Sequence, residues 1–162
     1  MKKSVGFMTQ AAMIAAIYVV LVFVFAPISF GPVQIRVAEA LTILPLFTPA
    51  AVPGVFIGCL IGNLLSPGMI VLDIVFGSLT TLVAAIISYK LRSNKYLVSV
   101  PPIVLNMIVV PFVLKYGYGV PMPIFLSALA VGAGQVVSCY GLGFILIQVL
   151  EKYSNQIFIK HT

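Results

Sequence analysis

The sequence has 162 residues, of which 62% are hydrophobic and 7% charged, and its net charge is +6. Soluble domains carry about a quarter charged residues, so we expect an integral membrane protein made of helices rather than a soluble domain. The basic residues lie in short loops and tails and form no stripe interleaved with aromatic residues, which argues against nucleic acid as a partner. A crossing takes about 20 apolar residues. We therefore expect five or six helices in one transmembrane domain over residues 1–162, without a nucleotide-binding domain.

The first predicted helix covers residues 7–25 and ends where proline forbids its continuation. It carries two overlapping pairs of alanines at four-residue spacing, Ala11 with Ala15 and Ala12 with Ala16. Such small residues let another helix approach closely. The residues alone favour packing within the chain, and docking against a partner protein is the alternative.

A loop with two prolines and a glycine leads into a short second helix over residues 37–47, about 16 Å long, which Pro45 is expected to bend. The third helix, over residues 54–65, carries glycines at strict four-residue spacing: Gly54, Gly58 and Gly62. That spacing predicts a smooth face for close helix contact. Helices 2 and 3 either both cross the membrane or form a re-entrant hairpin, and in both cases Arg36 and Asn63 return to the same side.

The fourth predicted helix covers residues 69–89, after a tight turn, with Asp73 about one turn inside it. The fifth starts at Pro101 and Pro102, which suit a first helical turn, and ends before Lys115. The sixth covers residues 122–150 and contains several glycines, which favour kinks and close packing. We find no internal repeat, so an inverted-repeat carrier is not supported.

The distribution of Lys and Arg predicts the orientation of this six-helix arrangement. One side has seven basic residues and the other has two: Lys2, Lys3, Lys90, Arg92, Lys95, Lys152 and Lys160 against Arg36 and Lys115. Basic residues concentrate in cytoplasmic loops. We therefore expect a multi-pass protein of the cell membrane with both termini in the cytoplasm.

Between Lys3 and Lys90 the only charged residues are Arg36, Glu39 and Asp73. A charge in a lipid-embedded segment is costly, which makes each of them a candidate functional residue. Arg36 and Glu39 share one face of a helical turn, so they either pair with each other or both contact a bound molecule. Asp73 has no cation within four residues, so a structural partner has to come from elsewhere in the chain.

Three amides complete the candidate substrate-binding set. Asn63 returns to the same outer half of the membrane as the charged residues, although a residue at a helix end can also be a cap or turn residue. Asn106 and Gln135 lie deeper, and single amides in apolar helices serve either as helix–helix hydrogen bonds or as ligand contacts. Acidic groups in such a pocket suit a ligand with several N–H donors or a positive charge.

The sequence lacks the residue sets that catalysis or metal binding require. His161 lies in the tail, Cys59 and Cys139 lie singly in apolar segments, and there is no phosphate-binding loop. We therefore expect neither an enzyme nor a bound metal or cofactor, and two reduced, buried thiols.

The stretch VQIRVAEALTILPLFTPAAVPGVFIGCLIGNLLS, followed by LDIVFGSLTTL, resembles the queuosine-precursor transporter family (QueT), substrate-binding S-components of energy-coupling-factor (ECF) transporters. The resemblance covers residues 32–85, about a third of the chain. It combines a charged pair, a proline-punctuated hairpin and a glycine-spaced helix in one order. It implies a six-transmembrane-helix bundle that captures a 7-deazaguanine: 7-cyano-7-deazaguanine, 7-aminomethyl-7-deazaguanine or queuine.

The resemblance also implies partners. Energy would come from a module of two cytosolic ATPases and a transmembrane coupling protein, on which S-components commonly dock through an alanine strip of the first helix. On that basis we expect Ala11 with Ala15, or Ala12 with Ala16, to form a partner face. Glu39 would accept the N–H groups of the guanine-like edge, and Asp73 would face the 7-substituent.

Two other functions fit the composition. One is an S-component for another vitamin-like solute. The other is a self-assembling membrane channel or structural protein, which predicts homo-oligomers and no tightly bound ligand.

Overall fold

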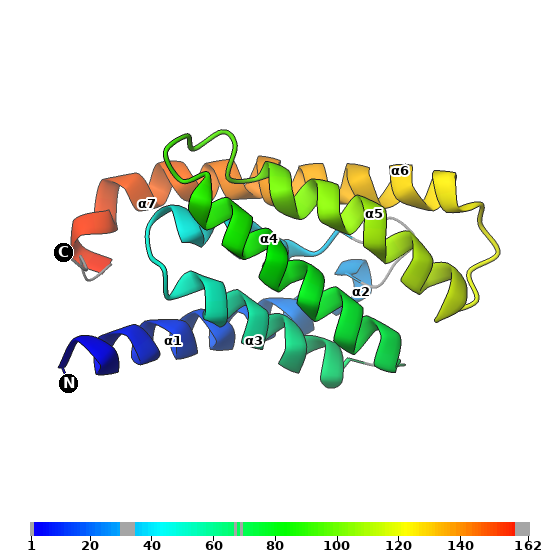
Figure 1. Ribbon diagram of the computed structural model, residues 1–162, viewed down its shortest axis with the longest axis horizontal. Helices are drawn as coiled ribbons and strands as arrows, with labels where there is room; N and C mark the ends of the chain where they lie inside the picture. Colours follow the sequence, from blue (N-terminus) through cyan, green and yellow to red (C-terminus); the bar gives the residue numbers. More distant parts are fainter. Residues whose placement is uncertain (1, 30–34, 67, 69, 158–162) are drawn as a thin grey trace.

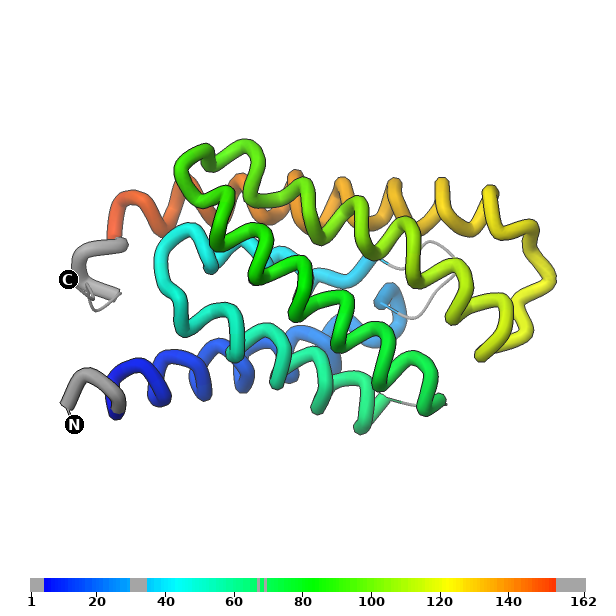
Figure 2. The backbone as a smooth tube through the Cα atoms, in the orientation of Figure 1, coloured from blue at the N-terminus to red at the C-terminus, as the bar shows by residue number. Residues whose placement is uncertain are grey.

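The computed structural model describes residues 2–29, 35–66, 68 and 70–157, and every regular element in them is a helix (Figures 1 and 2). The α-helices are α1 (Lys2–Val24), α2 (Ala26–Ser29), α3 (Ala51–Leu64), α4 (Ser78–Lys90), α5 (Val100–Tyr116), α6 (Ile124–Gln135) and α7 (Gly143–Ile157). A 3-10 helix, η1 (Val37–Leu46), and two π-helices, η2 (Asp73–Gly77) and η3 (Val136–Leu142), complete the set. The helical fold class is thus confirmed for these residues. Met69, the predicted start of the fourth helix, lies outside them.

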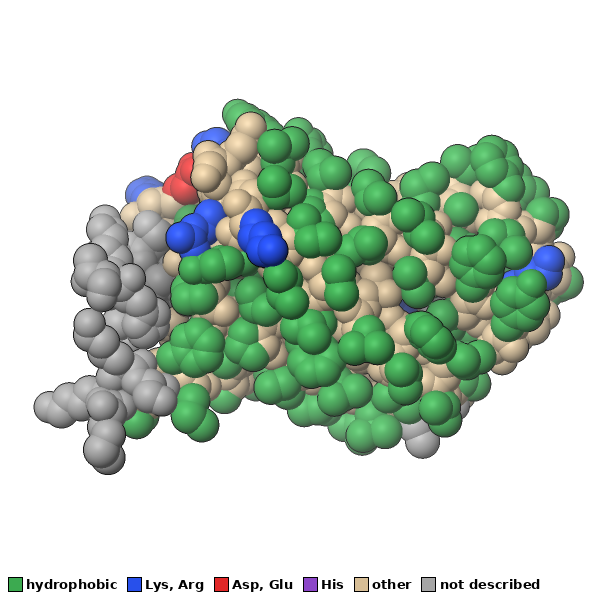
Figure 3. Space-filling view, viewed as in Figure 1, with side chains coloured by type: hydrophobic (Ala, Val, Ile, Leu, Met, Phe, Trp, Pro, Cys, Tyr) green, Lys and Arg blue, Asp and Glu red, His purple; other side chains and the backbone are tan. Residues whose placement is uncertain are grey.

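Among the described residues, three helical stretches are long and apolar enough to cross a membrane: Val5–Val24, Asp73–Lys90 and Ile124–Tyr153. Three shorter apolar helices accompany them: Val37–Leu46, Ala51–Leu64 and Val100–Tyr116. Hydrophobic side chains cover most of the face shown in Figure 3. So large an apolar surface suits contact with lipid, and the fold is consistent with a membrane helix bundle. The count of six crossings stays a prediction.

The second predicted helix is a 3-10 helix with Pro45 inside it. Its residues from Ala38 to Pro45 are all buried, which makes η1 the central element of the fold. A 3-10 helix rises about 2.0 Å per residue instead of 1.5 Å, so these ten residues span roughly 20 Å. The predicted length of about 16 Å assumed α-helical geometry.

The glycine face of α3 packs on α1. A methyl group on Gly58 would lie 2.6 Å from Tyr18 Cβ, and one on Gly54 would lie 2.9 Å from Ile14 Cβ. Only glycine permits so close an approach, because real Cβ atoms essentially never meet at such distances. The predicted use of these glycines for close helix contact is therefore confirmed.

Contact with α3 covers only one of the two alanine pairs of α1. Ala11 and Ala15 are buried, and their carbonyl oxygens lie near the α3 glycines. Ala12 and Ala16 are exposed on another face of α1. The structure therefore places one pair inside the chain and leaves the other on the surface.

The start of α1, the connection between α4 and α5, and the end of α7 lie at one end of the molecule, and the connection between α5 and α6 lies at the other (Figure 1). An ion pair joins two of these segments, because Lys95 Nζ lies 3.0 Å from Glu151 Oε1. Asp73 lies toward the other end, because its side chain contacts Tyr118 in the connection between α5 and α6.

Candidate functional site

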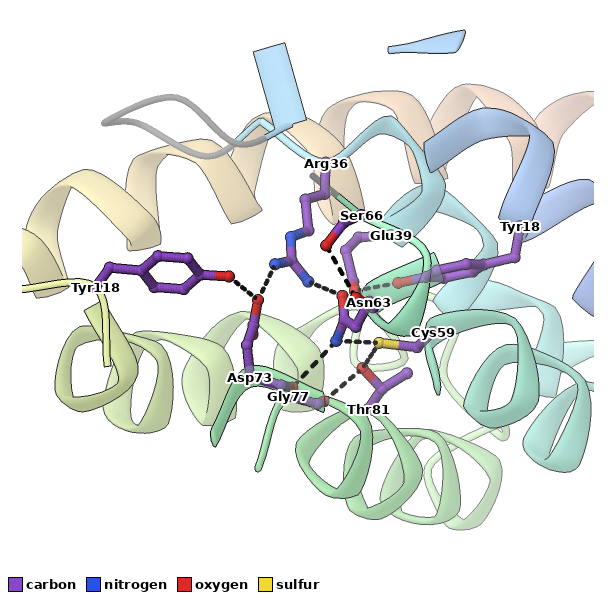
Figure 4. A network of polar contacts seen from close by, with 10 residues as sticks. All are labelled: Tyr18, Arg36, Glu39, Cys59, Asn63, Ser66, Asp73, Gly77, Thr81 and Tyr118. Carbon is purple, nitrogen blue, oxygen red and sulfur yellow. Dashed lines mark hydrogen bonds and ion pairs between the residues drawn. The ribbon is translucent and has the colours of Figure 1, made fainter. Parts of the chain in front are cut away.

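The three charged residues that the sequence analysis singled out, together with Asn63, are buried close to one another (Figure 4). Arg36 directly precedes η1 and Glu39 lies in its first turn. Asn63 comes from the end of α3, and Asp73 is the first residue of η2. Their exposed fractions are only 7%, 1%, 3% and 3% in that order, so bulk water does not solvate these charges.

Arg36 joins the other two segments. Its Nη1 donates to Asn63 Oδ1 and its Nη2 to Asp73 Oδ2, each at 3.4 Å. Asn63 Nδ2 in turn donates to the backbone oxygen of Asp73 at 3.2 Å. The cation that Asp73 lacks in its local sequence is therefore Arg36, and Arg36 and Asn63 do return to the same side.

Asn63 also serves the turn after α3. Its backbone carbonyl oxygen accepts hydrogen bonds from the Ser66 hydroxyl at 2.9 Å and from the Ser66 backbone N–H at 3.3 Å. Its side chain is engaged in the charged cluster at the same time. Asn63 is therefore a turn residue whose side chain also belongs to the charged cluster, and its contact with a ligand stays a prediction.

Tyr118 is a member of the cluster that the sequence did not reveal. It lies in the connection after α5, and its hydroxyl donates to Asp73 Oδ2 at 3.1 Å. Burial raises the pKa of this phenol to about 12, and the neighbouring Asp73 carboxylate adds to the effect. Tyr118 therefore stays a neutral hydrogen-bond donor near neutral pH. Nothing in the local sequence around Tyr118 indicates this contact, because the two residues are 45 positions apart.

Glu39 is held differently from Asp73. Its Oε1 accepts a hydrogen bond of 2.6 Å from the hydroxyl of Tyr18, a residue of α1. Its second carboxylate oxygen, Oε2, is buried and accepts no hydrogen bond from the part of the chain that the structure describes. An unpaired buried carboxylate oxygen is costly, so a donor supplied from outside the chain would stabilise it.

The two deeper amides have different surroundings. Gln135 Oε1 accepts from Cys139 Sγ at 3.1 Å, one turn along the same helical stretch. Cys139 Sγ lies 3.6 Å from the backbone oxygen of Glu39, so Gln135 and Cys139 lie next to η1. Asn106 is 5% exposed, and its Nδ2 has no hydrogen-bond partner among the described residues.

Both cysteines are free and buried, as expected. Within the residues that the structure describes, no group of three or more His, Cys, Asp or Glu side chains could hold a metal ion. The site is a mixed-charge cluster surrounded by apolar helices, and its charged and amide groups are suited to hydrogen bonding.

Comparison with known proteins identifies the family. The family model described as "QueT transporter" matches residues 8–152. A curated relative from Lactococcus lactis subsp. cremoris (strain MG1363), named "Queuosine precursor transporter QueT", is 40% identical over 86 residues, which is 51% of this chain and 50% of the relative. The match thus spans about half the length of that relative. No solved structure matches the chain.

The matched residues of the family model cover far more than the stretch on which the resemblance was first seen, and include every candidate site residue. A family of transporters is not one of enzymes, which confirms the expectation of a non-catalytic protein. The chain belongs to the QueT transporter family.

Proposed function

We propose that this chain is the substrate-binding S-component of an ECF transporter, which captures a queuosine precursor outside the cell for ATP-driven uptake. Family membership and the printed name of the relative support the transported compound. The energy would come from separate subunits, a transmembrane coupling protein and two cytosolic ATPases. The precursor would be a 7-deazaguanine: the 7-cyano compound, the 7-aminomethyl compound or queuine.

The observation that carries this proposal is the state of Glu39. A buried carboxylate with one oxygen held by Tyr18 and the other lacking a donor in the described residues is suited to N–H groups of a ligand. A guanine-like edge presents an N–H and an NH₂ side by side. Two carboxylate oxygens offer about four acceptor positions. Glu39 can therefore accept both ligand groups while it retains the hydrogen bond from Tyr18.

Asp73 is proposed to face the substituent at the 7-position. Its Oδ2 already accepts from Arg36 and Tyr118. An ammonium group of the aminomethyl compound would share this carboxylate with Arg36, whereas a neutral nitrile would form no ion pair. We propose Arg36, Asn63, Asn106 and Gln135 as the remaining polar contacts of the ligand.

The proposed topology has six helical segments, with the long stretch from α6 to α7 counted as one. Both chain ends would then lie in the cytoplasm, with the charged cluster in the outer half of the membrane. The start of α1, the α4–α5 connection and the end of α7 share one end of the molecule (Figure 1), as an even number of crossings requires. The excess of Lys and Arg on those segments supports a cytoplasmic location.

The docking face for the coupling protein is proposed to centre on Ala12 and Ala16. These residues are exposed on α1, where their small side chains permit close approach of a partner helix. Ala11 and Ala15 are covered by α3 and contribute by letting α1 and α3 pack closely.

Mass spectrometry of small molecules retained by the purified protein, followed by calorimetric titration, tests this function. The titrants are the three 7-deazaguanines, with thiamine, riboflavin and biotin as controls. We expect a 7-deazaguanine to be retained and to bind, and the three vitamins not to bind. Binding of a vitamin would instead make the chain an S-component for another solute. Homo-oligomers without any bound compound would indicate a channel or structural protein.

A further inference from the structure

The hydroxyl group of Tyr18 has a role that neither the family match nor the sequence pattern assigns. Tyr18 lies in α1, is 1% exposed, and donates to Glu39 Oε1 across 21 positions of sequence. Figure 4 shows its ring approaching Glu39 from the side opposite to that from which Tyr118 approaches Asp73. Each carboxylate of the cluster is thus bonded to one tyrosine hydroxyl.

The ring of Tyr18 is fixed by the packing of α1 on α3. A methyl group on Gly58 would lie 2.6 Å from Tyr18 Cβ and 2.9 Å from its Cγ, so the ring base is pressed against the α3 backbone. Tyr18 also belongs to the main hydrophobic core, with Val55 and Cys59 of α3. A close-packed ring has little freedom to move, so its hydroxyl is held at one position.

The hydrogen bond itself is short. Its 2.6 Å separation falls in the range of O–H···O⁻ bonds to an ionised carboxylate, about 2.5–2.7 Å. Because Tyr18 holds Oε1, the rotation of the Glu39 carboxylate is set, and Oε2 is the oxygen left without a donor from the described residues.

We propose that Tyr18 is a positioning residue for ligand recognition: it orients the Glu39 carboxylate so that Oε2 meets the N–H donors of the ligand. The inference rests on the proposed function, because it requires that Glu39 contacts the ligand. Tyr18 itself acts only through Glu39. A tyrosine that merely fills the core would affect stability, and its removal would not depend on the identity of residue 39.

A double-mutant cycle separates these roles. The 7-cyano compound, whose nitrile gains no ion pair with Asp73, is titrated into the intact protein and into Tyr18→Phe, Glu39→Gln and the double variant. Loss of a hydrogen bond to a charged group predicts roughly tenfold weaker binding for Tyr18→Phe. The double variant should bind within about twofold of Glu39→Gln alone, because the two residues act as one unit.

Two further variants serve as controls. Tyr116→Phe removes a hydroxyl from a residue that is 70% exposed and should bind like the intact protein. Replacement of Tyr18 by 4-aminophenylalanine keeps a ring of the same size with an N–H donor, and should recover most of the affinity that Tyr18→Phe loses.

The outcomes are distinguishable. Weak binding by Glu39→Gln together with full binding by Tyr18→Phe would overturn the role of Tyr18 and leave the proposed function intact. So would losses that multiply in the double variant, since Tyr18 would then act independently of Glu39. Full binding by Glu39→Gln would overturn both this inference and the proposed ligand contact.

Discussion

The buried ion pair between Arg36 and Asp73 leads to a stability prediction. It tests whether burial or the N–O distance decides how much an ion pair contributes to the free energy of unfolding. Asp73→Asn removes one charge and changes the shape of the side chain little. The two side chains are 8% and 5% exposed, and Arg36 Nη2 lies 3.4 Å from Asp73 Oδ2. The matched control is Glu151→Gln in the pair with Lys95, whose N–O distance is shorter, 3.0 Å, but whose side chains are 36% and 44% exposed.

The magnitude follows from the surroundings. Removing one partner of a buried ion pair generally costs about 3–5 kcal/mol, and the loss is reduced here because the Glu39 carboxylate of the same cluster remains close to Arg36. The 3.4 Å distance exceeds the about 2.7–2.9 Å of a strong charged hydrogen bond, and Asn63 retains its own contact with Arg36. We therefore expect a loss at the lower end, about 3 kcal/mol. An exposed pair contributes less than about 1 kcal/mol.

Equilibrium unfolding of the purified protein in mixed detergent micelles measures both losses. Asp73→Asn should lower the free energy of unfolding by about 3 kcal/mol, and Glu151→Gln by less than about 1 kcal/mol. Equal, small losses for the two single variants would refute the reasoning that burial decides the strength of these pairs.

Three other predictions concern docking, packing and topology. Ala12→Leu, on the exposed face of α1, should abolish uptake of labelled precursor by cells while the isolated chain still binds it; undiminished uptake would argue against a docking face there. Gly58→Ala should lower the free energy of unfolding by about 1–3 kcal/mol because its methyl group would clash with α1. Gly141→Ala, whose methyl group would lie 3.8 Å from the backbone oxygen of Val136, an ordinary contact distance, should cost much less, and equal losses would contradict the packing argument. A cysteine at Pro121 should react with an impermeant reagent from outside and one at Asn94 only after permeabilisation, because the first lies in the predicted outer connection and the second in the predicted cytoplasmic one. The two native cysteines are buried and should not contribute to the labelling. The reverse pattern would overturn the orientation.

The sequence could predict the buried charged cluster because charged residues are so rare in it. Between Lys3 and Lys90 only three charged residues occur, and the cost of burying a charge makes each of them informative. The hairpin formed by η1 and α3 explains why Arg36 and Asn63 meet at one depth. The spacing of the apolar segments and the cost of burying a charge were therefore enough to single out these residues.

The actual partners of these charges could not be predicted in the same way. Asp73 pairs with Arg36 across 37 positions, and Glu39 accepts from Tyr18 across 21, so neither bond has a local signal. A tyrosine in an apolar helix usually indicates packing or an interfacial position. The sequence thus identified the carboxylates but not the tyrosine hydroxyl groups that are hydrogen-bonded to them.

The 3-10 geometry of η1 could not be predicted from the sequence either. Its residues are nearly all apolar and are buried on every side from Ala38 to Pro45, so no polar face marks a period of 3.0 or 3.6 residues. The glycines of α3 predicted close contact but not the partner helix. The packing of these glycines on α1 covers Ala11 and Ala15 and leaves Ala12 and Ala16 exposed.

Titration of Glu39→Gln tests ligand recognition at the buried cluster most directly. The 7-cyano and 7-aminomethyl compounds are each titrated calorimetrically into the intact protein and into this variant. Both share the guanine-like edge, and losing a charge-assisted contact costs about 1.5–3 kcal/mol. We therefore expect both compounds to bind at least about tenfold more weakly, by similar factors. Unchanged affinity for both compounds in Glu39→Gln would contradict the assignment of this carboxylate to the ligand.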